Sequence, residues 1–180
     1  MASPDIGAPA ADPVQACVLR LQNGDTSALE PLIEATQARA WHLAYSILQN
    51  RQEVEDALQD CYLTVFQNIA QLRQPEAFWG WFKRIVVHRC WRLHRRPALE
   101  LMEEWEAEDT PEVLPEERLD LQQAFQKLSL TDRTVLGLRE ILDMPYEQIA
   151  QLLEVPLNPV RTRLHHARQR FSRLFTGGAK

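Results

Sequence analysis

Glycine, cysteine and long apolar runs are all scarce in this sequence of 180 residues. Six glycines are too few for an all-β protein, which needs a tight turn about every dozen residues. No apolar run approaches the roughly 18 residues that cross a membrane as a helix, so we expect no membrane insertion. Residues 1–13 lack a basic start followed by an apolar stretch, and we therefore expect no secretory signal.

The three cysteines, Cys17, Cys61 and Cys90, are odd in number and lack CxxC spacing. This pattern disfavours a disulfide scaffold and fits a reducing cytoplasm, which is the compartment we predict. Cys90 lies between His88 and His94, but the spacing of these three residues matches no common zinc site. We therefore predict neither a bound metal nor a cofactor.

Charge is distributed unevenly along the chain, although the formal net charge is only −5. Residues 83–96 and residues 157–180 each hold six cationic side chains and no acid. Residues 100–120 between them hold ten acids and one arginine. Two basic blocks on either side of an acidic block indicate charged partners such as nucleic acid. The alternative is a set of solvated faces whose charges cancel.

Helical periodicity accounts for nearly the whole sequence outside one segment rich in proline and acids. We therefore predict an all-α fold with two small helical domains joined by a flexible acidic linker. The expected segments are a disordered tail (1–12), a first domain (13–97), the linker (98–115) and a second domain (116–176).

Several polar residues are expected to cap helix N-termini, because their side-chain oxygens accept hydrogen bonds from backbone amides of the first turn. They include Asp12, Asn50, Thr131 and Asn158. The helices are expected at about residues 13–23, 25–49, 50–72, 74–96, 116–128, 132–142, 145–153 and 159–175.

The helix expected at 50–72 has two different faces. Apolar residues recur at steps of three and four and form one buried stripe. The stripe consists of Val54, Leu58, Cys61, Val65, Ile69 and Leu72. The opposite face, which we call the docking face, consists of Asp56, Gln59, Asp60, Leu63 and Phe66. Large apolar residues among acids suit contact with another protein better than contact with water.

The helix expected at 74–96 interleaves aromatic rings with cations. Its core stripe consists of Phe78, Phe82 and Ile85. Trp79, Trp81 and Trp91 project at widely different angles and do not all share that stripe. Stacking rings and phosphate-binding cations are what single-stranded nucleic acid needs. The cations are Lys83, Arg84, Arg89 and Arg92. The alternative is that the tryptophans pack against neighbouring helices and the cations face solvent.

The last two helices have the lengths and turn residues of a helix-turn-helix, with Pro145 opening the first and Asn158 capping the second. The buried stripe of the second consists of Val160, Leu164, Ala167, Phe171 and Leu174. At about 100° per residue, a polar ridge projects outward between two arginine pairs. The ridge consists of Thr162, His165, His166 and Gln169, and the pairs are Arg161 with Arg168 and Arg163 with Arg170. Such a helix fits a major groove. The alternative is a solvated amphipathic helix.

Together these residues resemble the extracytoplasmic-function (ECF) group of bacterial sigma-70 factors, from about residue 13 to residue 175. The likeness is carried by Gly24-Asp25 with Ala28 and Leu29, by Glu55–Asp60 (EDALQD), by Phe78, Trp81, Ile85 and Arg95-Arg96, and by Leu121–Phe175. Their order and spacing together are highly specific. The chain departs from the family at His88, Arg92 and Asn158-Pro159, so base-level specificity does not carry over.

The resemblance implies a sigma factor without enzymatic activity of its own. The docking face would bind core RNA polymerase, residues 78–96 would recognise and open the −10 promoter element, and the last helix would recognise the −35 element. For the −10 element the implied residues are Trp79, Trp81, Lys83, Arg84, His88, Arg89 and Arg92. The resemblance also implies an anti-sigma factor as a partner.

Two other classes of protein compete with this interpretation. A stand-alone helix-turn-helix regulator would bind DNA without polymerase, but it needs neither the docking face nor the acidic linker. A helical nucleic-acid-processing enzyme would use the carboxylates Glu53, Asp56 and Asp60 as metal ligands. That helix lacks the Glu-x-x-His pairs which helical carboxylate sites use.

Overall fold

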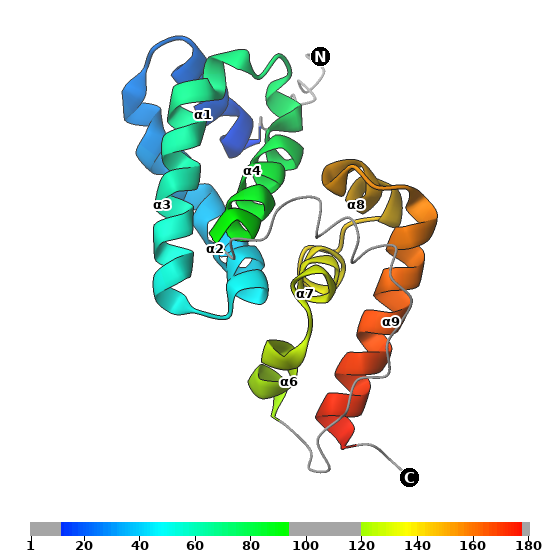
Figure 1. Ribbon diagram of the computed structural model, residues 1–180. Coiled ribbons are helices and arrows are strands. Elements are labelled where there is room, and N and C mark those ends of the chain that lie inside the picture. Colours follow the sequence, from blue (N-terminus) through cyan, green and yellow to red (C-terminus); the bar gives the residue numbers. More distant parts are fainter. Residues whose placement is uncertain (1–11, 94–119, 178–180) are drawn as a thin grey trace, which may run out of the picture.

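The computed structural model describes residues 12–93 and 120–177, and every regular element in these ranges is helical (Figure 1). The N-terminal group comprises α1 (Pro13–Gln22), α2 (Leu29–Leu48), α3 (Arg51–Asn68) and α4 (Phe78–Leu93), with 3₁₀ turns η1 (Thr26–Ala28), η2 (Ile69–Gln71) and η3 (Pro75–Ala77). The C-terminal group comprises α6 (Leu121–Lys127), α7 (Leu130–Leu136), the π-helical segment η4 (Gly137–Ile141), α8 (Tyr146–Leu153) and α9 (Leu157–Thr176).

The all-α fold with two helical groups confirms the prediction of fold class. Several predictions lie outside the described residues: nearly all of the tail (1–12), the acidic linker (98–115), and the ends of the helices expected at 74–96 and 116–128.

Two predicted caps start helices of the N-terminal group. The Asp12 side chain accepts from the Val14 amide at the start of α1. The Asn50 side chain accepts from the amides of Gln52 and Glu53 at the start of α3. Both caps satisfy backbone donors that have no partner inside the helix. The starts of α1 and α3 therefore follow from local sequence, as predicted, whereas α3 ends at Asn68, before the expected Leu72.

The core of the N-terminal group contains the predicted stripe of α3, with Leu72 only partly buried at its end. Phe78 and Phe82 of α4 stack at 5.4 Å between ring centroids and are almost completely buried. Cys61 belongs to this core, where burial raises the pKa of its thiol to about 12. A thiol that stays protonated packs as an apolar side chain.

Two predicted caps in the C-terminal group are wrong by two residues. Ser129, not Thr131, caps α7 and accepts from the Asp132 amide, while Thr131 is buried inside the helix. The second, Asn158, lies in the first turn of α9, which begins at Leu157 after Pro156. Pro156 sets the chain direction into α9, and Glu154 ends α8 in a left-handed conformation (φ 59°). The turn of the helix-turn-helix is therefore shorter than expected.

The two groups pack directly against each other, with α2 and α4 of the N-terminal group facing α7, η4 and α8 (Figure 1). The approach is close at Gly137, where a Cβ atom would lie 2.2 Å from the Ser46 Oγ. The Trp91 indole Nε1 donates to the Thr134 Oγ1 at 3.0 Å across this junction. The Gln122 amide also donates to the Tyr45 hydroxyl at 3.2 Å. Sequence periodicity did not predict these contacts.

Candidate functional site

The docking face of α3 is exposed to solvent as predicted. Leu63 and Phe66, three residues apart on one helix face, are 52% and 43% exposed and together present apolar area to solvent. Asp56 and Gln59 beside them are exposed. Asp60 is half-buried, because its carboxylate forms an ion pair with Arg89 of α4. The face therefore joins an apolar pair to acids, and Asp60 links it to the neighbouring helix.

A groove of about 530 Å³ runs between α3 and α4. It brings together residues that the sequence assigned to two separate sites. Its lining includes Asp60 and Leu63 of the docking face and Trp81, Arg84, His88, Arg89 and Arg92 of α4. The predicted protein-binding and DNA-binding residues of these two helices therefore form adjoining surfaces.

The three tryptophans of α4 differ in exposure. Trp79 and Trp81 are half-buried, and each packs edge-on against Phe78. Trp91 is buried, and its indole donates to Thr134 of α7. For Trp91 the structure matches the alternative in which a tryptophan packs against neighbouring helices. Trp79 and Trp81 keep ring surface accessible.

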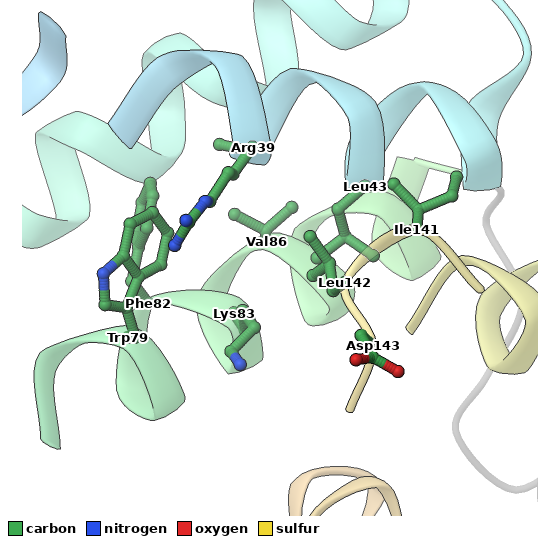
Figure 2. Close-up of a pocket in the computed structure, with 10 residues that line it drawn as sticks. Arg39, Leu43, Trp79, Phe82, Lys83, Val86, Ile141, Leu142 and Asp143 are labelled. Carbon is green, nitrogen blue, oxygen red and sulfur yellow. The ribbon is translucent and has the colours of Figure 1, made fainter. Parts of the chain in front are cut away.

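Arg39 of α2 is a further cation beside Trp79, and the sequence pattern did not reveal it. The Arg39 guanidinium of α2 lies 5.4 Å from the Trp79 ring centroid, in a cation–π contact. Arg39 and Lys83 line a cavity of about 270 Å³ at the junction with the C-terminal group (Figure 2). Burial, and secondarily the charge of Arg39, lower the pKa of the Lys83 ammonium. No sequence signal linked Arg39 to α4, because 44 positions separate it from Lys83.

Arg84 and His88 lie one turn apart on α4, and Arg84 reaches the C-terminal end of α8. The Arg84 guanidinium forms a salt bridge with Glu154 at 3.1 Å and donates to the Gln151 carbonyl oxygen at 2.9 Å. Burial and the neighbouring Arg84 charge lower the pKa of the His88 imidazole, and Glu154 opposes this effect. Two predicted DNA-binding residues are thus close to an acid of α8.

The outward ridge of α9 is largely where the helical periodicity predicts it. Thr162, His165 and Gln169 are exposed, while His166 is half-buried. A hydrogen bond of 3.0 Å joins the Gln169 amide to the His165 ring. Polar groups capable of both donating and accepting therefore project from one side of the second helix of a helix-turn-helix.

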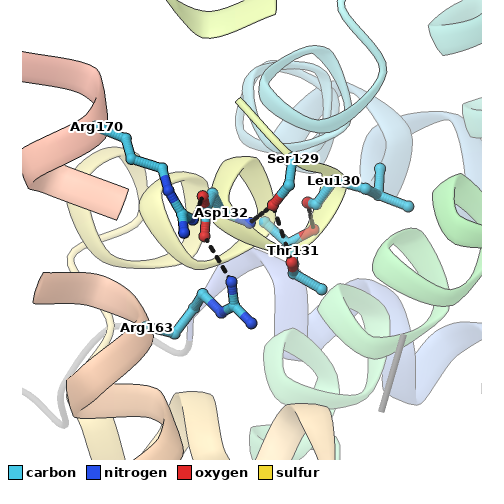
Figure 3. Close-up of polar contacts among 7 residues, drawn as sticks. Ser129, Leu130, Thr131, Asp132, Arg163 and Arg170 are labelled. Atoms are coloured by element: carbon cyan, nitrogen blue, oxygen red, sulfur yellow. Dashed lines mark hydrogen bonds and ion pairs between the residues drawn. The ribbon is translucent and has the colours of Figure 1, made fainter. Parts of the chain in front are cut away.

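One of the two predicted arginine pairs is not on the surface. Arg163 is 7% exposed, and its guanidinium faces the fully buried Asp132 of α7 at 3.5 Å (Figure 3). Arg170 is largely buried and reaches the other oxygen of the same carboxylate at 2.6 Å. Seven residues are almost two helical turns, so both side chains lie on one side of α9. The prediction that they flank the ridge as exposed cations is wrong.

The other arginine pair is exposed, as predicted. Arg168 pairs with Glu140 at 2.6 Å and donates to the Tyr146 hydroxyl at 3.2 Å, and these contacts raise the pKa of its guanidinium. Arg161 lies 3.8 Å from Glu147 in a long surface ion pair. Asn158 is exposed beside it in the first turn. Of the two predicted arginine pairs, only Arg161 with Arg168 therefore flanks the ridge as accessible cations.

Metal ligands do not cluster in the described ranges, 12–93 and 120–177: no group of three or more His, Cys, Asp or Glu side chains is close enough to hold an ion. The same part of the chain contains no helix of sufficient length and apolarity to cross a membrane.

Two family models match this chain in the order of its helical groups. Sigma-70 region 2 matches residues 32–98, and sigma-70 region 4 matches residues 118–171. The ECF RNA polymerase sigma factor SigE of Mycolicibacterium smegmatis is 33% identical over 160 residues, which are 81% of this chain and 62% of that protein. The RNA polymerase sigma-H factor of Pseudomonas aeruginosa is 28% identical over 174 residues, which are 86% of this chain and 90% of that protein.

Solved structures share the fold. CnrH in complex with the cytosolic domain of CnrY aligns with a TM-score of 0.67 at 21% identity, over 91% of this chain and 97% of that chain. The sigma factor RpoE of Bartonella quintana, in complex with the anti-sigma factor NepR, aligns with a TM-score of 0.62 at 17% identity, over 79% of this chain and 92% of that chain.

Proposed function

The chain belongs to the ECF group of the sigma-70 family and is an alternative sigma factor that directs promoter-specific transcription, and we propose that its docking face, α4 and α9 divide this work. In this proposal residues 13–97 form the region 2 domain and residues 116–176 the region 4 domain. The acidic segment 98–115 joins them, and residues 1–12 precede them.

The docking face of α3 is our proposed contact with core RNA polymerase. Leu63 and Phe66 supply apolar area, and Asp56 and Gln59 supply polar contacts at its edge. An exposed apolar pair beside acids is the composition of a protein interface. Asp60 contributes through its ion pair with Arg89, which couples the docking face to the DNA-binding helix.

For −10 recognition we propose the basic and aromatic surface of α4. Trp79 and Trp81 offer rings for unpaired bases, and cations on both sides offer contacts to phosphates. The cations are Lys83, Arg84, Arg89 and Arg92, with His88 between them on the same helix. Partial burial of the rings leaves a stacking surface held rigidly by Phe78.

The −35 element is assigned to α9 as the second helix of the helix-turn-helix. Thr162, His165, His166 and Gln169 would meet base edges, because they project from its outward side. Arg161 and Arg168, with Asn158 in the first turn, would contact phosphates. Arg163 and Arg170 would hold α9 on α7 through Asp132 instead of touching DNA.

The proposal gives the chain three partners: core RNA polymerase, promoter DNA and an anti-sigma factor. The last is supported by RpoE, which shares the fold of this chain and was solved in complex with the anti-sigma factor NepR. We propose that the chain acts in the cytoplasm as a DNA-binding regulator and leaves catalysis to the polymerase.

One observation carries this proposal: the same chain has both the exposed docking face and a helix-turn-helix with a polar outward ridge. Run-off transcription with purified core RNA polymerase on a candidate promoter tests it. Asp56→Lys should reduce both polymerase binding and transcript yield, because the charge of the docking face is reversed. Glu34→Lys, an exposed change of the same charge on α2, is the matched control.

Unchanged polymerase binding by Asp56→Lys would contradict the docking assignment. DNA binding by the chain without any polymerase-dependent transcript would favour a stand-alone regulator.

A further inference from the structure

His165 and Gln169 form a hydrogen-bonded pair on the outward ridge of α9. They lie about one helical turn apart, and both side chains are exposed. The Gln169 Nε2 lies 3.0 Å from the His165 Nε2. The His165 ring also lies 5.7 Å from the His166 ring, between centroids. The pair therefore presents one joined polar surface on the side of α9 where we propose that DNA binds.

The chemistry of the two nitrogen atoms fixes the direction of this hydrogen bond. An amide nitrogen can only donate, so the Gln169 Nε2 is the donor. The His165 Nε2 must then accept. A ring nitrogen accepts only in the neutral imidazole, whose single proton here lies on Nδ1. The arrangement in the structure is therefore that of a neutral His165.

The bond to His165 uses one of the two amide hydrogens of Gln169. The second hydrogen lies on the same side of the amide as Oε1, so one donor and one acceptor stay available side by side. Adenine offers the complementary pair in the major groove, an acceptor at N7 and a donor at N6, and glutamine can bind both at once. Because the bond to His165 keeps the amide from turning over, donor and acceptor keep a fixed order, which matches adenine in one orientation of the base pair.

Protonation of His165 reverses this order. Both ring nitrogens then donate, so the ring can no longer accept from the Gln169 amide. The amide turns over about its last side-chain bond, which brings Oε1 to the ring and exchanges the positions of donor and acceptor. An adenine matched to the first order then meets donor against donor and acceptor against acceptor. Imidazoles change charge between about pH 5 and 8, so the exchange falls in an accessible range.

Charged groups on α9 and on the elements around it surround the pair. In the ranges that the structure describes, none of them is hydrogen-bonded or ion-paired to the His165 ring. Gln169 is therefore the group whose orientation the charge of His165 changes directly. The charged groups are Arg161, Arg163, Arg168 and Arg170 of α9, Glu147 of α8, Glu140 of η4, Asp132 of α7, and Asp120 and Lys127 at the two ends of α6.

We propose that His165 is a positioning residue for −35 recognition: its neutral form holds the Gln169 amide in the order that reads adenine, and its protonated form reverses that order. This inference rests on the proposed role of α9 in −35 recognition and adds the base that Gln169 reads. One base preference within the −35 element therefore depends on pH.

Two variants hold the amide in a single order and do not titrate between about pH 6 and 8. His165→Glu supplies only acceptors and should orient Gln169 as the neutral imidazole does. His165→Lys supplies only donors and should orient it as the protonated imidazole does. His42→Lys makes the same change at an exposed histidine of α2 and is the matched control.

The experiment selects preferred sequences for the full-length chain from a duplex DNA pool with a randomised segment, at about pH 6 and about pH 8. Sequencing gives the ratio of affinities for adenine and for the other bases at each position, and a change in overall charge alters all sequences alike. We expect one position where adenine is preferred about tenfold at the higher pH and about twofold or less at the lower pH. Gln169→Ala should remove this preference at both pH values.

His165→Glu should keep the adenine preference at both pH values, His165→Lys should lose it at both, and His42→Lys should match the unmodified chain. A Gln169-dependent preference that is equal at the two pH values would overturn the role of His165. A pH dependence that persists in His165→Glu and His165→Lys would do the same, and a Gln169-dependent preference for another base would overturn the assignment of adenine. Selection of no sequence at either pH would instead contradict the assignment of α9 to the −35 element.

Discussion

Asp132 is a fully buried carboxylate whose two oxygens face two different arginines of α9. A buried charge without a partner of opposite charge is costly in free energy. The arrangement therefore depends on Asp132, Arg163 and Arg170 all remaining ionised. Its role is to set the rotation of α9 on α7, which decides which residues of α9 face outward. If α9 recognises DNA as proposed, Asp132 therefore affects that recognition without touching DNA.

Asp132→Asn should destabilise the protein by about 3–5 kcal/mol, because it leaves the charges of Arg163 and Arg170 buried without their carboxylate. Urea unfolding followed by circular dichroism measures this free energy. Glu140→Gln removes the carboxylate partner of Arg168, which is half-exposed, and should cost about 1 kcal/mol or less. Similar losses for the two variants would contradict the structural role of the buried cluster.

His88 should titrate below the ordinary pKa of 6.5, because burial and Arg84 disfavour its protonated form in the folded protein. Between the pKa of His88 in the folded protein and 6.5, the unfolded chain binds more protons at this imidazole than the folded chain does. The free energy of unfolding should therefore fall as the pH drops from 6.5 towards the folded pKa. NMR titration of the imidazole gives the pKa, and unfolding at several pH values gives the stability. His88→Gln should flatten this part of the pH dependence; an equally steep dependence would argue against His88 as its source.

At the scale of single elements, α9 separates the outward ridge, which we propose specifies sequence, from arginines that hold the helix on α7. Its outward ridge and its buried stripe follow from one helical period, but the arginines beside them divide between solvent and Asp132. The same residue type thus serves two purposes on adjacent sides of one helix. Three classes of variant should therefore behave differently.

Gln169→Ala should change which −35 bases are preferred, at a cost of about 1–3 kcal/mol at the contacted base pair. Arg168→Ala should weaken binding to all sequences about equally and reduce the salt dependence by about one phosphate contact. Arg163→Ala should differ from both, because its main effect should be a lower free energy of unfolding. Selection from randomised −35 DNA at two salt concentrations distinguishes the first two variants. A shifted preferred sequence for Arg168→Ala, with none for Gln169→Ala, would show that the outward side has been misassigned.

At the scale of the whole molecule, the junction links the stabilities of the two helical groups. The hydrogen bond from Trp91 to Thr134 is buried and joins residues 43 positions apart in the sequence. Loss of its acceptor would leave an indole N–H buried without a partner, which costs more than the bond itself is worth. The junction should therefore contribute measurably to the unfolding cooperativity of the full chain.

Thr134→Val keeps the side-chain shape and removes the acceptor, and it should destabilise the chain by about 1–3 kcal/mol. Trp91→Phe in the same background should cost less than it does alone, giving a coupling energy of about 0.5–1.5 kcal/mol. Chemical unfolding of the unmodified chain, the two single variants and the double variant measures this coupling energy. Additive effects would mean that the bond does not link the two groups in solution.

The sequence by itself determined the helices and their inward faces. Asp12 and Asn50 cap helices because a cap needs only a side-chain oxygen within three residues of the amides that it accepts from. The stripe of α3 is buried because a period of 3.6 residues aligns its apolar side chains on one face. The same period exposes Leu63 and Phe66. These features depend on neighbours within one or two helical turns.

Only the tertiary structure decided which outward residues stay accessible. Periodicity gives the direction of a side chain but not what lies opposite it, and the partners here are distant in sequence. Arg163 meets Asp132 across 31 positions, Trp91 meets Thr134 across 43, and Arg84 meets the Gln151 carbonyl across 67. Each pair forms because two helices are brought together by the burial of apolar faces elsewhere along them, and no local pattern at either residue encodes that approach.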